Sequence, residues 1–120
     1  MTPLDAFLDR PEIARLVRAL AAHPGRIVRP AAAVRLAATA AMLRLGDSGP
    51  ELLLIRRAKV ERDPWSGHVA WPGGHMEPTD PDLAAAAVRE THEETHIDLG
   101  RQGRILGTLD DIHPRTPVPP

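Results

Sequence analysis

Residues 71–99 decide the fold of this chain, and they read WPGGHMEPTDPDLAAAAVRETHEETHIDL. A double-glycine turn, Gly73-Gly74, leads through an acidic loop into a helix that contains a run of four alanines. We expect this helix to begin at Asp80, because Asp favours the N-cap and Pro81 suits the first helical position. The other end of the same helix carries a concentration of carboxylates.

These carboxylates are an unfavourable local choice. Glu90, Glu93 and Glu94 stand at i, i+3 and i+4, so they project from one side of the helix, where like charges cost about 0.2–0.5 kcal/mol per pair. The helix C-terminus adds to this cost, because the macrodipole favours cations there. A bound divalent cation would offset both effects. Mg²⁺ or Mn²⁺ is the simplest candidate, since hard cations prefer carboxylate oxygens.

The bulk composition excludes several classes of protein. The chain has 120 residues, a formal net charge of −1, 42% hydrophobic residues and no cysteine. This length suits one modest domain. The balanced charge gives no basic field for nucleic acid or an anionic membrane, and disulfides and thiolate metal sites are excluded. Residues 1–10 hold no long apolar run, so we expect neither a signal peptide nor a membrane span. We therefore expect a cytoplasmic protein.

Hydrophobic periodicity predicts the elements around the central stretch. Apolar residues at three- and four-residue spacing indicate an amphipathic helix within 5–23, restarted by Pro11. Two apolar runs flank the turn GDSGP at 46–50 and predict a hairpin with strands at 37–45 and 51–57. The remaining expectations are a strand at 68–71, a strand at 104–109 and an extended or disordered Pro-rich tail at 113–120.

Two motifs compete for the end of the central helix. Residues 92–96, HEETH, match H-E-x-x-H, in which two histidines bind zinc and the glutamate is a general base. The extended form of this motif needs Gly at 99 and His at 102, where the chain has Leu99 and Gln102. A zinc peptidase is therefore the minor alternative.

The second motif is longer and includes the glycine turn. Gly74, Asp80, Arg89-Glu90, Glu93-Glu94 and Ile97 resemble the Nudix box, whose pattern is Gly, five residues, Glu, seven residues, Arg-Glu, aliphatic, any residue, Glu-Glu, any residue, Gly, aliphatic. The preceding blocks, LLIRR at 53–57 and WSGHVAWPGG at 65–74, resemble the branch of this family related to coenzyme A pyrophosphatases.

The chain departs from the box at three places. Asp80 stands in place of the first Glu, and eight residues separate it from Arg89, a spacing that the coenzyme A branch also shows. Thr91 replaces the aliphatic residue. His96 replaces the glycine at the helix end, so this histidine must bear a positive φ that glycine adopts at little cost.

The resemblance implies an α/β fold, namely a Nudix-like α/β/α sandwich with a mixed sheet, apparently truncated after the strand that follows the Nudix helix. It divides the chain into an N-terminal helical arm at 1–29, an incomplete Nudix-like domain at 30–112 and the Pro-rich tail at 113–120. A homodimer is one way to complete such a fold.

The implied activity is that of a pyrophosphohydrolase: metal-dependent hydrolysis of a nucleoside diphosphate linked to another moiety, with coenzyme A or a derivative as the candidate substrate. The alternative is a catalytically impaired module that binds nucleotide or a partner. The resemblance makes Glu90, Glu93, Glu94 and Arg89 the catalytic residues, with Asp80 or Glu77 bracing the loop onto the helix. It assigns Mg²⁺ or Mn²⁺ to the three glutamates and the Gly74 carbonyl, and substrate contacts to Arg56, Arg57, Gly73, Gly74 and His75.

Overall fold

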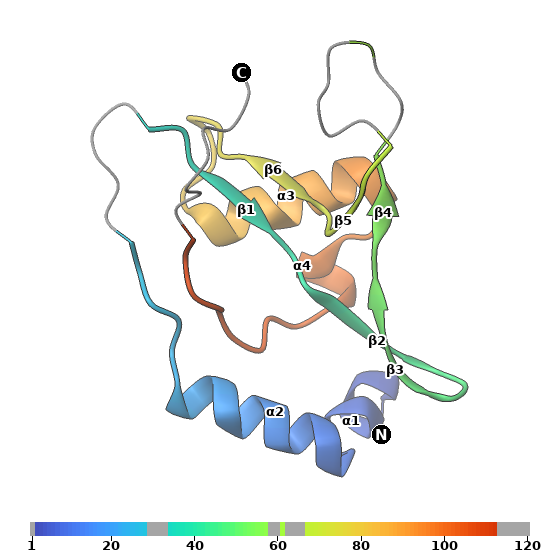
Figure 1. Cartoon of the computed structure of the whole chain (residues 1–120). Coiled ribbons are helices and arrows are strands. Elements are labelled where there is room, and N and C mark those ends of the chain that lie inside the picture. Colours follow the sequence, from blue (N-terminus) through green and yellow to red (C-terminus); the bar gives the residue numbers. More distant parts are fainter. Residues whose placement is uncertain (1, 29–33, 58–60, 62–66, 113–120) are drawn as a thin grey trace. The chain divides into compact units, whose positions relative to one another are not determined.

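The structure is a computed structural model that describes residues 2–28, 34–57, 61 and 67–112. The described residues form two compact units, one from within 1–33 and 104–120 and the other from 34–103. Figure 1 shows their elements in chain order. The domain boundaries expected at 29 and 112 stay a prediction, and the expected tail at 113–120 lies outside the described residues.

The first unit holds two helices, α1 at Pro3–Leu8 and α2 at Pro11–Ala22. Thr2 caps α1 through a reciprocal pair: the Asp5 amide donates to the Thr2 hydroxyl at 3.1 Å, and the Thr2 amide donates to Asp5 Oδ2 at 3.0 Å. Pro11 occupies the start of α2, which confirms the predicted restart. No helix in the described ranges is both long and apolar enough to cross a membrane.

Residues 104–112 also belong to the first unit, and the described residues contain no strand there. The strand predicted at 104–109 is therefore wrong. The end of this segment instead meets the chain that follows α2. The Arg26 amide donates to Asp110 Oδ1 at 2.8 Å, the Val28 amide donates to Asp111 Oδ2 at 3.0 Å, and the Asp111 amide donates to the Arg26 carbonyl at 2.8 Å. Because two of these acceptors are side chains, the pairing does not extend into a ladder.

The second unit contains three antiparallel strand pairs among its described residues. They are β1 (Ala37–Thr39) with β6 (Gly73–His75), β2 (Met42–Gly46) with β3 (Gly49–Leu53), and β4 (Ile55–Arg56) with β5 (Val69–Ala70). The α/β class is confirmed. The expected mixed sheet is not seen among the described residues, because each of the three strand pairs is antiparallel. Each long strand predicted from the sequence is divided, at 40–41 and at Leu54.

The predicted hairpin is confirmed in the β2–β3 pair. Its register closes with Gly46 opposite Gly49, so residues 47 and 48 form the turn. Gly49 has a φ of 130°, which a residue with a Cβ rarely adopts.

Gly73 and Gly74 lie in β6, so the double-glycine turn expected there is wrong. Gly73 has a φ of 157°, and a Cβ at this position would come within 2.6 Å of the Thr39 Cα in β1. Close approach of the neighbouring strand therefore requires glycine here.

The central helix is α3, Leu83–Thr95. It begins later than predicted, because the N-cap is Asp82, whose Oδ1 accepts from the Ala85 amide at 2.8 Å. Its end agrees with the prediction: His96 is the C-cap and has a φ of 63°, the left-handed conformation. A short helix, α4 at Leu99–Gln102, follows.

Small residues let α3 approach the β1–β6 pair closely. Ala86, Ala87 and Thr91 are buried, and α3 packs against both strands, which lie alongside it in Figure 1. The last turns of α3 therefore present their side chains beside β6, and this packing builds the site.

Candidate active site

The first component of the site is the edge of β6 that points away from β1. On the other edge, the Pro72 carbonyl accepts a hydrogen bond from the Ala40 amide, and the Met76 amide donates one to the Leu36 carbonyl, each at 2.8 Å. Ala40 and Leu36 flank β1, so both bonds mark the edge of β6 that faces β1. Backbone groups alternate in direction along an antiparallel strand. The groups of Gly74 therefore face β1, whereas those of Gly73 and His75 face the opposite edge.

Side chains from α3 occupy part of this edge. The Gly73 amide donates to Glu94 Oε1 at 2.9 Å, and the His75 carbonyl accepts from Arg89 Nη2 at 3.1 Å. Both contacts agree with the alternation along β6. They fix the register of the helix end against the strand.

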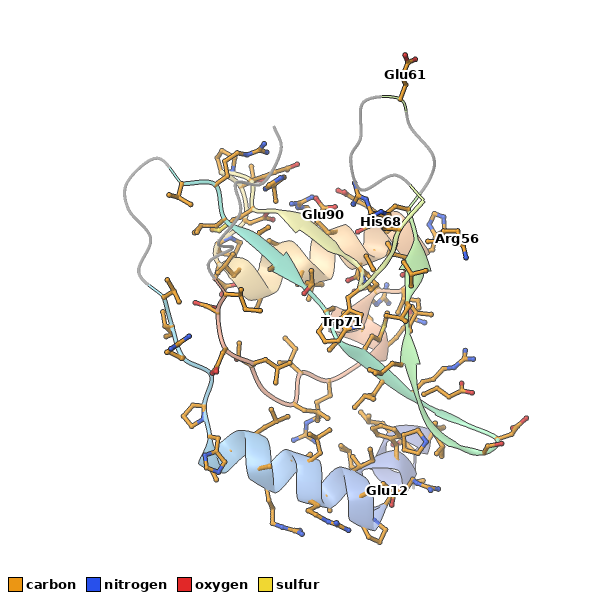
Figure 2. All side chains as sticks on the ribbon, in the orientation of Figure 1. Glu12, Arg56, Glu61, His68, Trp71 and Glu90 are labelled. Atoms are coloured by element: carbon orange, nitrogen blue, oxygen red, sulfur yellow. The ribbon has the colours of Figure 1, made fainter. Side chains whose placement is uncertain are left out.

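Glu90 lies directly against the other glycine of β6. A Cβ at Gly74 would come within 2.6 Å of the Glu90 carboxyl carbon and 2.8 Å of both its oxygens. Figure 2 shows Glu90 projecting from α3 beside β6, and about a fifth of its side chain is exposed. Glycine at 74 therefore gives the carboxylate room to lie against the strand.

Arg89 is the centre of a charge network at the helix end. Its Nε and Nη2 donate to the two oxygens of Asp80, both at 2.9 Å. Its Nη1 lies 3.1 Å from Glu90, 3.2 Å from Glu93 and 3.6 Å from Glu77. One guanidinium thus holds the loop before α3 and the carboxylates of the last turns together.

This network changes the acidity of its central pair. Arg89 donates to Asp80 and, with a further hydrogen bond from the Glu77 amide, lowers the pKa of that carboxyl below its usual 3.8. Hydrogen bonding to Asp80 is likewise the main cause of a raised pKa at Arg89, with Glu93 and Glu90 adding to it. Both groups stay ionised over the ordinary pH range.

A cavity of about 660 Å³ opens beside this arrangement. Six residues predicted for the site line it: Arg57, Gly73, Gly74, His75, Glu90 and Glu94. Four residues that the sequence analysis did not assign to catalysis or binding line it as well: Arg35, Met76, Glu77 and Pro78. Carboxylates, cationic side chains and an open strand edge therefore meet in one space.

Three other predicted site residues take different positions. Arg89 braces the cavity from the network described above, and Glu93 contacts Arg89 with 57% of its side chain exposed. Arg56 is exposed on β4, and Figure 2 shows it projecting outward. None of these three is among the described residues that line the cavity.

The sequence analysis did not identify Arg35 as a site residue, because the sequence does not show which strand pairs with the segment around it. It lies two residues before β1, in a stretch whose alanine content left helix and strand open. The pairing of Ala37 with His75 continues through a bond of 2.8 Å from the Met76 amide to the Leu36 carbonyl. This tertiary pairing, which is not visible in the local sequence, brings the segment to the cavity.

The H-E-x-x-H reading does not fit the helix geometry. That motif needs two histidines on successive turns of one helix, but α3 ends at Thr95 and His96 turns into the left-handed conformation. The described residues hold no cluster of three or more His, Asp or Glu side chains arranged to bind a metal. Two carboxylates and a backbone carbonyl beside one cavity nevertheless fit Mg²⁺, which usually takes one or two carboxylates and keeps waters or substrate phosphates.

Comparison with known proteins extends these observations. Residues 34–120 match the family model for the NUDIX domain. An uncharacterized protein of Schizosaccharomyces pombe is 45% identical over 65 residues, which cover 53% of this chain and 20% of that protein. Uncharacterized Nudix hydrolases NudL of Enterobacter sp. and Photorhabdus laumondii are 51% and 42% identical over 63 and 64 residues, covering 52% and 53% of this chain and 32% and 33% of theirs. The chain thus spans a third or less of these relatives, and by its family match it belongs to the Nudix family.

Proposed function

We propose that this chain is a metal-dependent hydrolase of nucleoside diphosphates linked to another moiety. The observation that carries the proposal is the meeting of Glu90 and Glu94 with the open edge of β6 in one cavity. Membership of the Nudix family supports hydrolysis of this class of substrate.

Glu90 and Glu94 would hold Mg²⁺ or Mn²⁺ together with one backbone carbonyl. We assign that carbonyl to Gly73 in place of Gly74, because the backbone groups of Gly74 face β1 and those of Gly73 face the edge that Glu94 reaches. When bound, the ion supplies Lewis-acid polarisation of the phosphoryl oxygens and lowers the pKa of a coordinated water.

The surrounding residues position these ligands. Arg89 would orient Glu90 through its ion pair with that carboxylate. It also pairs with the exposed Glu93, and Asp80 anchors Arg89 to the loop before α3. Arg57 lines the cavity and would contact the substrate phosphates. Arg56, exposed on β4, is the weaker candidate for that contact.

Coenzyme A or a derivative is the candidate substrate, on the resemblance of residues 65–74 to the corresponding block of coenzyme A pyrophosphatases. Residues 65 and 66 of this block lie outside the described residues. The rates of hydrolysis of coenzyme A and ADP-ribose should be compared to identify the substrate. The two compounds share the diphosphate linkage and differ in the attached moiety.

The test is hydrolysis of both compounds by the chain with Mg²⁺ or Mn²⁺, comparing the wild type with Glu94→Gln and His92→Ala. Because metal ions contribute several kcal/mol to such reactions, we expect Glu94→Gln to lower kcat at least about a hundredfold. His92→Ala should leave kcat within about twofold, since His92 is exposed on α3.

Two outcomes would contradict this proposal. A folded wild-type chain that hydrolyses no diphosphate would instead favour the module that binds nucleotide without turnover. The reverse ranking of the two variants would favour a catalytic role for His92 over the metal site at Glu94.

A further inference from the structure

The proposed function so far gives no role to Arg35, one of the arginines that line the cavity. Arg35 lines the same space as Glu90 and Glu94. The antiparallel register that pairs Ala37 with His75 places Arg35 opposite Glu77 when it is continued by two residues. A guanidinium thus lies at the margin of the β1–β6 pair, beside the cavity.

Glu77, the cross-strand neighbour of Arg35, is engaged elsewhere. Its Oε1 lies 3.6 Å from Arg89 Nη1, within the network around Asp80. Within the described part of the chain, Arg35 forms no ion pair. Opposite charges at such cross-strand positions stabilise the pairing when they contact each other. Because Arg35 makes no such contact with Glu77, no described residue compensates its positive charge at the cavity through an ion pair.

We propose that Arg35 binds a phosphate group of the substrate. This inference rests on the proposed function and names a residue that neither the family box nor the sequence analysis assigns. A diphosphate entering the cavity meets three carboxylates, from Glu77, Glu90 and Glu94. A cation that forms no ion pair with the described residues offsets that repulsion, and a guanidinium can also donate two parallel hydrogen bonds to phosphate oxygens.

The binding test uses imidodiphosphate, an analogue with a nitrogen bridge in place of the hydrolysable oxygen, titrated calorimetrically with saturating Mg²⁺. We expect Arg35→Met to raise the dissociation constant about tenfold, because a charge-assisted bidentate contact is lost. Arg35→Lys keeps the charge and loses the planar fork, so its affinity should fall between the two.

Arg44→Met is the matched control. Arg44 is a surface arginine on β2 that pairs with Glu51 at 2.8 Å, and it does not line the cavity among the described residues. The control removes the same charge from the chain and should leave the dissociation constant within about twofold. With a hydrolysed substrate, Arg35→Met should raise KM and leave kcat nearly unchanged, which is the pattern of uniform binding.

The outcomes separate this inference from the hydrolase proposal. Imidodiphosphate binding that depends on Arg35, in a chain that turns nothing over, supports Arg35 and contradicts the hydrolase. A wild type that does not bind imidodiphosphate, or an Arg35→Met dissociation constant within about twofold of the wild type, overturns the role of Arg35. Melting curves of each variant confirm folding, and Arg35→Lys replaces Arg35→Met in the comparison if the latter unfolds.

Discussion

Four carboxylates lie within ion-pair distance of the single guanidinium of Arg89. The sequence suggested that the acidic helix end needs a metal ion to offset its repulsion. The structure shows that Arg89 already provides part of this compensation, from within the helix itself. A metal would then add to an arrangement that the protein has oriented in advance.

Asp80→Asn tests the central ion pair through its pH dependence. The pKa of Asp80 is lowered in the folded chain, so the ionised carboxyl stabilises the fold above its unfolded value of 3.8, and this stabilisation is lost as pH falls through the folded value. We expect the difference in Tm between wild type and variant to be largest near neutral pH and to shrink below about pH 4. Melting curves followed by circular dichroism at several pH values measure it, and a difference that stays constant with pH would contradict the assignment.

Thr91→Val should stabilise the chain by about 1 kcal/mol, because Thr91 is fully buried and its hydroxyl has no hydrogen-bond partner among the described residues. Thr95→Val is the opposite control. Its hydroxyl donates to the Thr91 carbonyl at 2.7 Å and accepts from the Ile97 amide at 3.2 Å, so this change should destabilise. Denaturant unfolding gives both free energies, and a destabilised Thr91→Val would contradict the unpaired state of that hydroxyl.

At the residue scale, the sequence predicted the two carboxylates of the cavity, but it did not predict which backbone carbonyl or which further arginine lies beside them. Spacing along a helix placed Glu90 and Glu94 on one face, and both do line the cavity. The choice between the carbonyls of Gly73 and Gly74 depends on which edge of β6 each faces, and strand register sets this. Arg35 also depends on that register, so neither point was accessible from local pattern.

At the scale of elements, α3 shows how tertiary contacts override local signals. Asp80 and Asp82 both precede a helical run, and Asp80 with Pro81 matched the usual start. Asp80 is instead bound by Arg89, nine residues later, and Asp82 caps the helix. The C-terminal end of the helix was predicted at His96, the position where the Nudix box has a glycine. His96 does adopt the left-handed conformation.

His96→Gly should stabilise α3, because a non-glycine residue in the left-handed region costs about 1 kcal/mol. His92→Gly is the matched control within the helix, where glycine is unfavourable by about 1 kcal/mol relative to alanine. Thermal unfolding of the two variants should therefore move in opposite directions. A decrease in Tm for both would show that His96 makes contacts worth more than its backbone strain.

At the scale of the whole molecule, contacts distant in sequence decide what the segment after α4 becomes. Its apolar residues predicted a strand at 104–109, but the described segment forms no strand and its end is held by aspartate contacts. Asp110 and Asp111 bind amides more than eighty residues earlier. No local pattern predicts such partners, and the homodimer expected from the sequence also stays a prediction.

Asp111→Ala should expose the Val28 amide, which donates to that carboxylate at 3.0 Å. Hydrogen exchange followed by NMR should show faster exchange at Val28, by roughly tenfold if a charge-assisted bond is lost. Asp110→Ala is the reciprocal control and should accelerate Arg26 in preference to Val28. Equal exchange at Val28 in wild type and Asp111→Ala would contradict the contact.

The proposed hydrolase requires a divalent metal held by the carboxylates of α3 at the edge of β6. Titration of the chain with Mn²⁺, followed by the loss of the free-ion EPR signal, tests this claim most directly. We expect saturable binding that Glu94→Gln weakens at least about tenfold and that Glu51→Gln, on the β2–β3 hairpin, leaves unchanged. Identical titration curves for wild type and Glu94→Gln would contradict it.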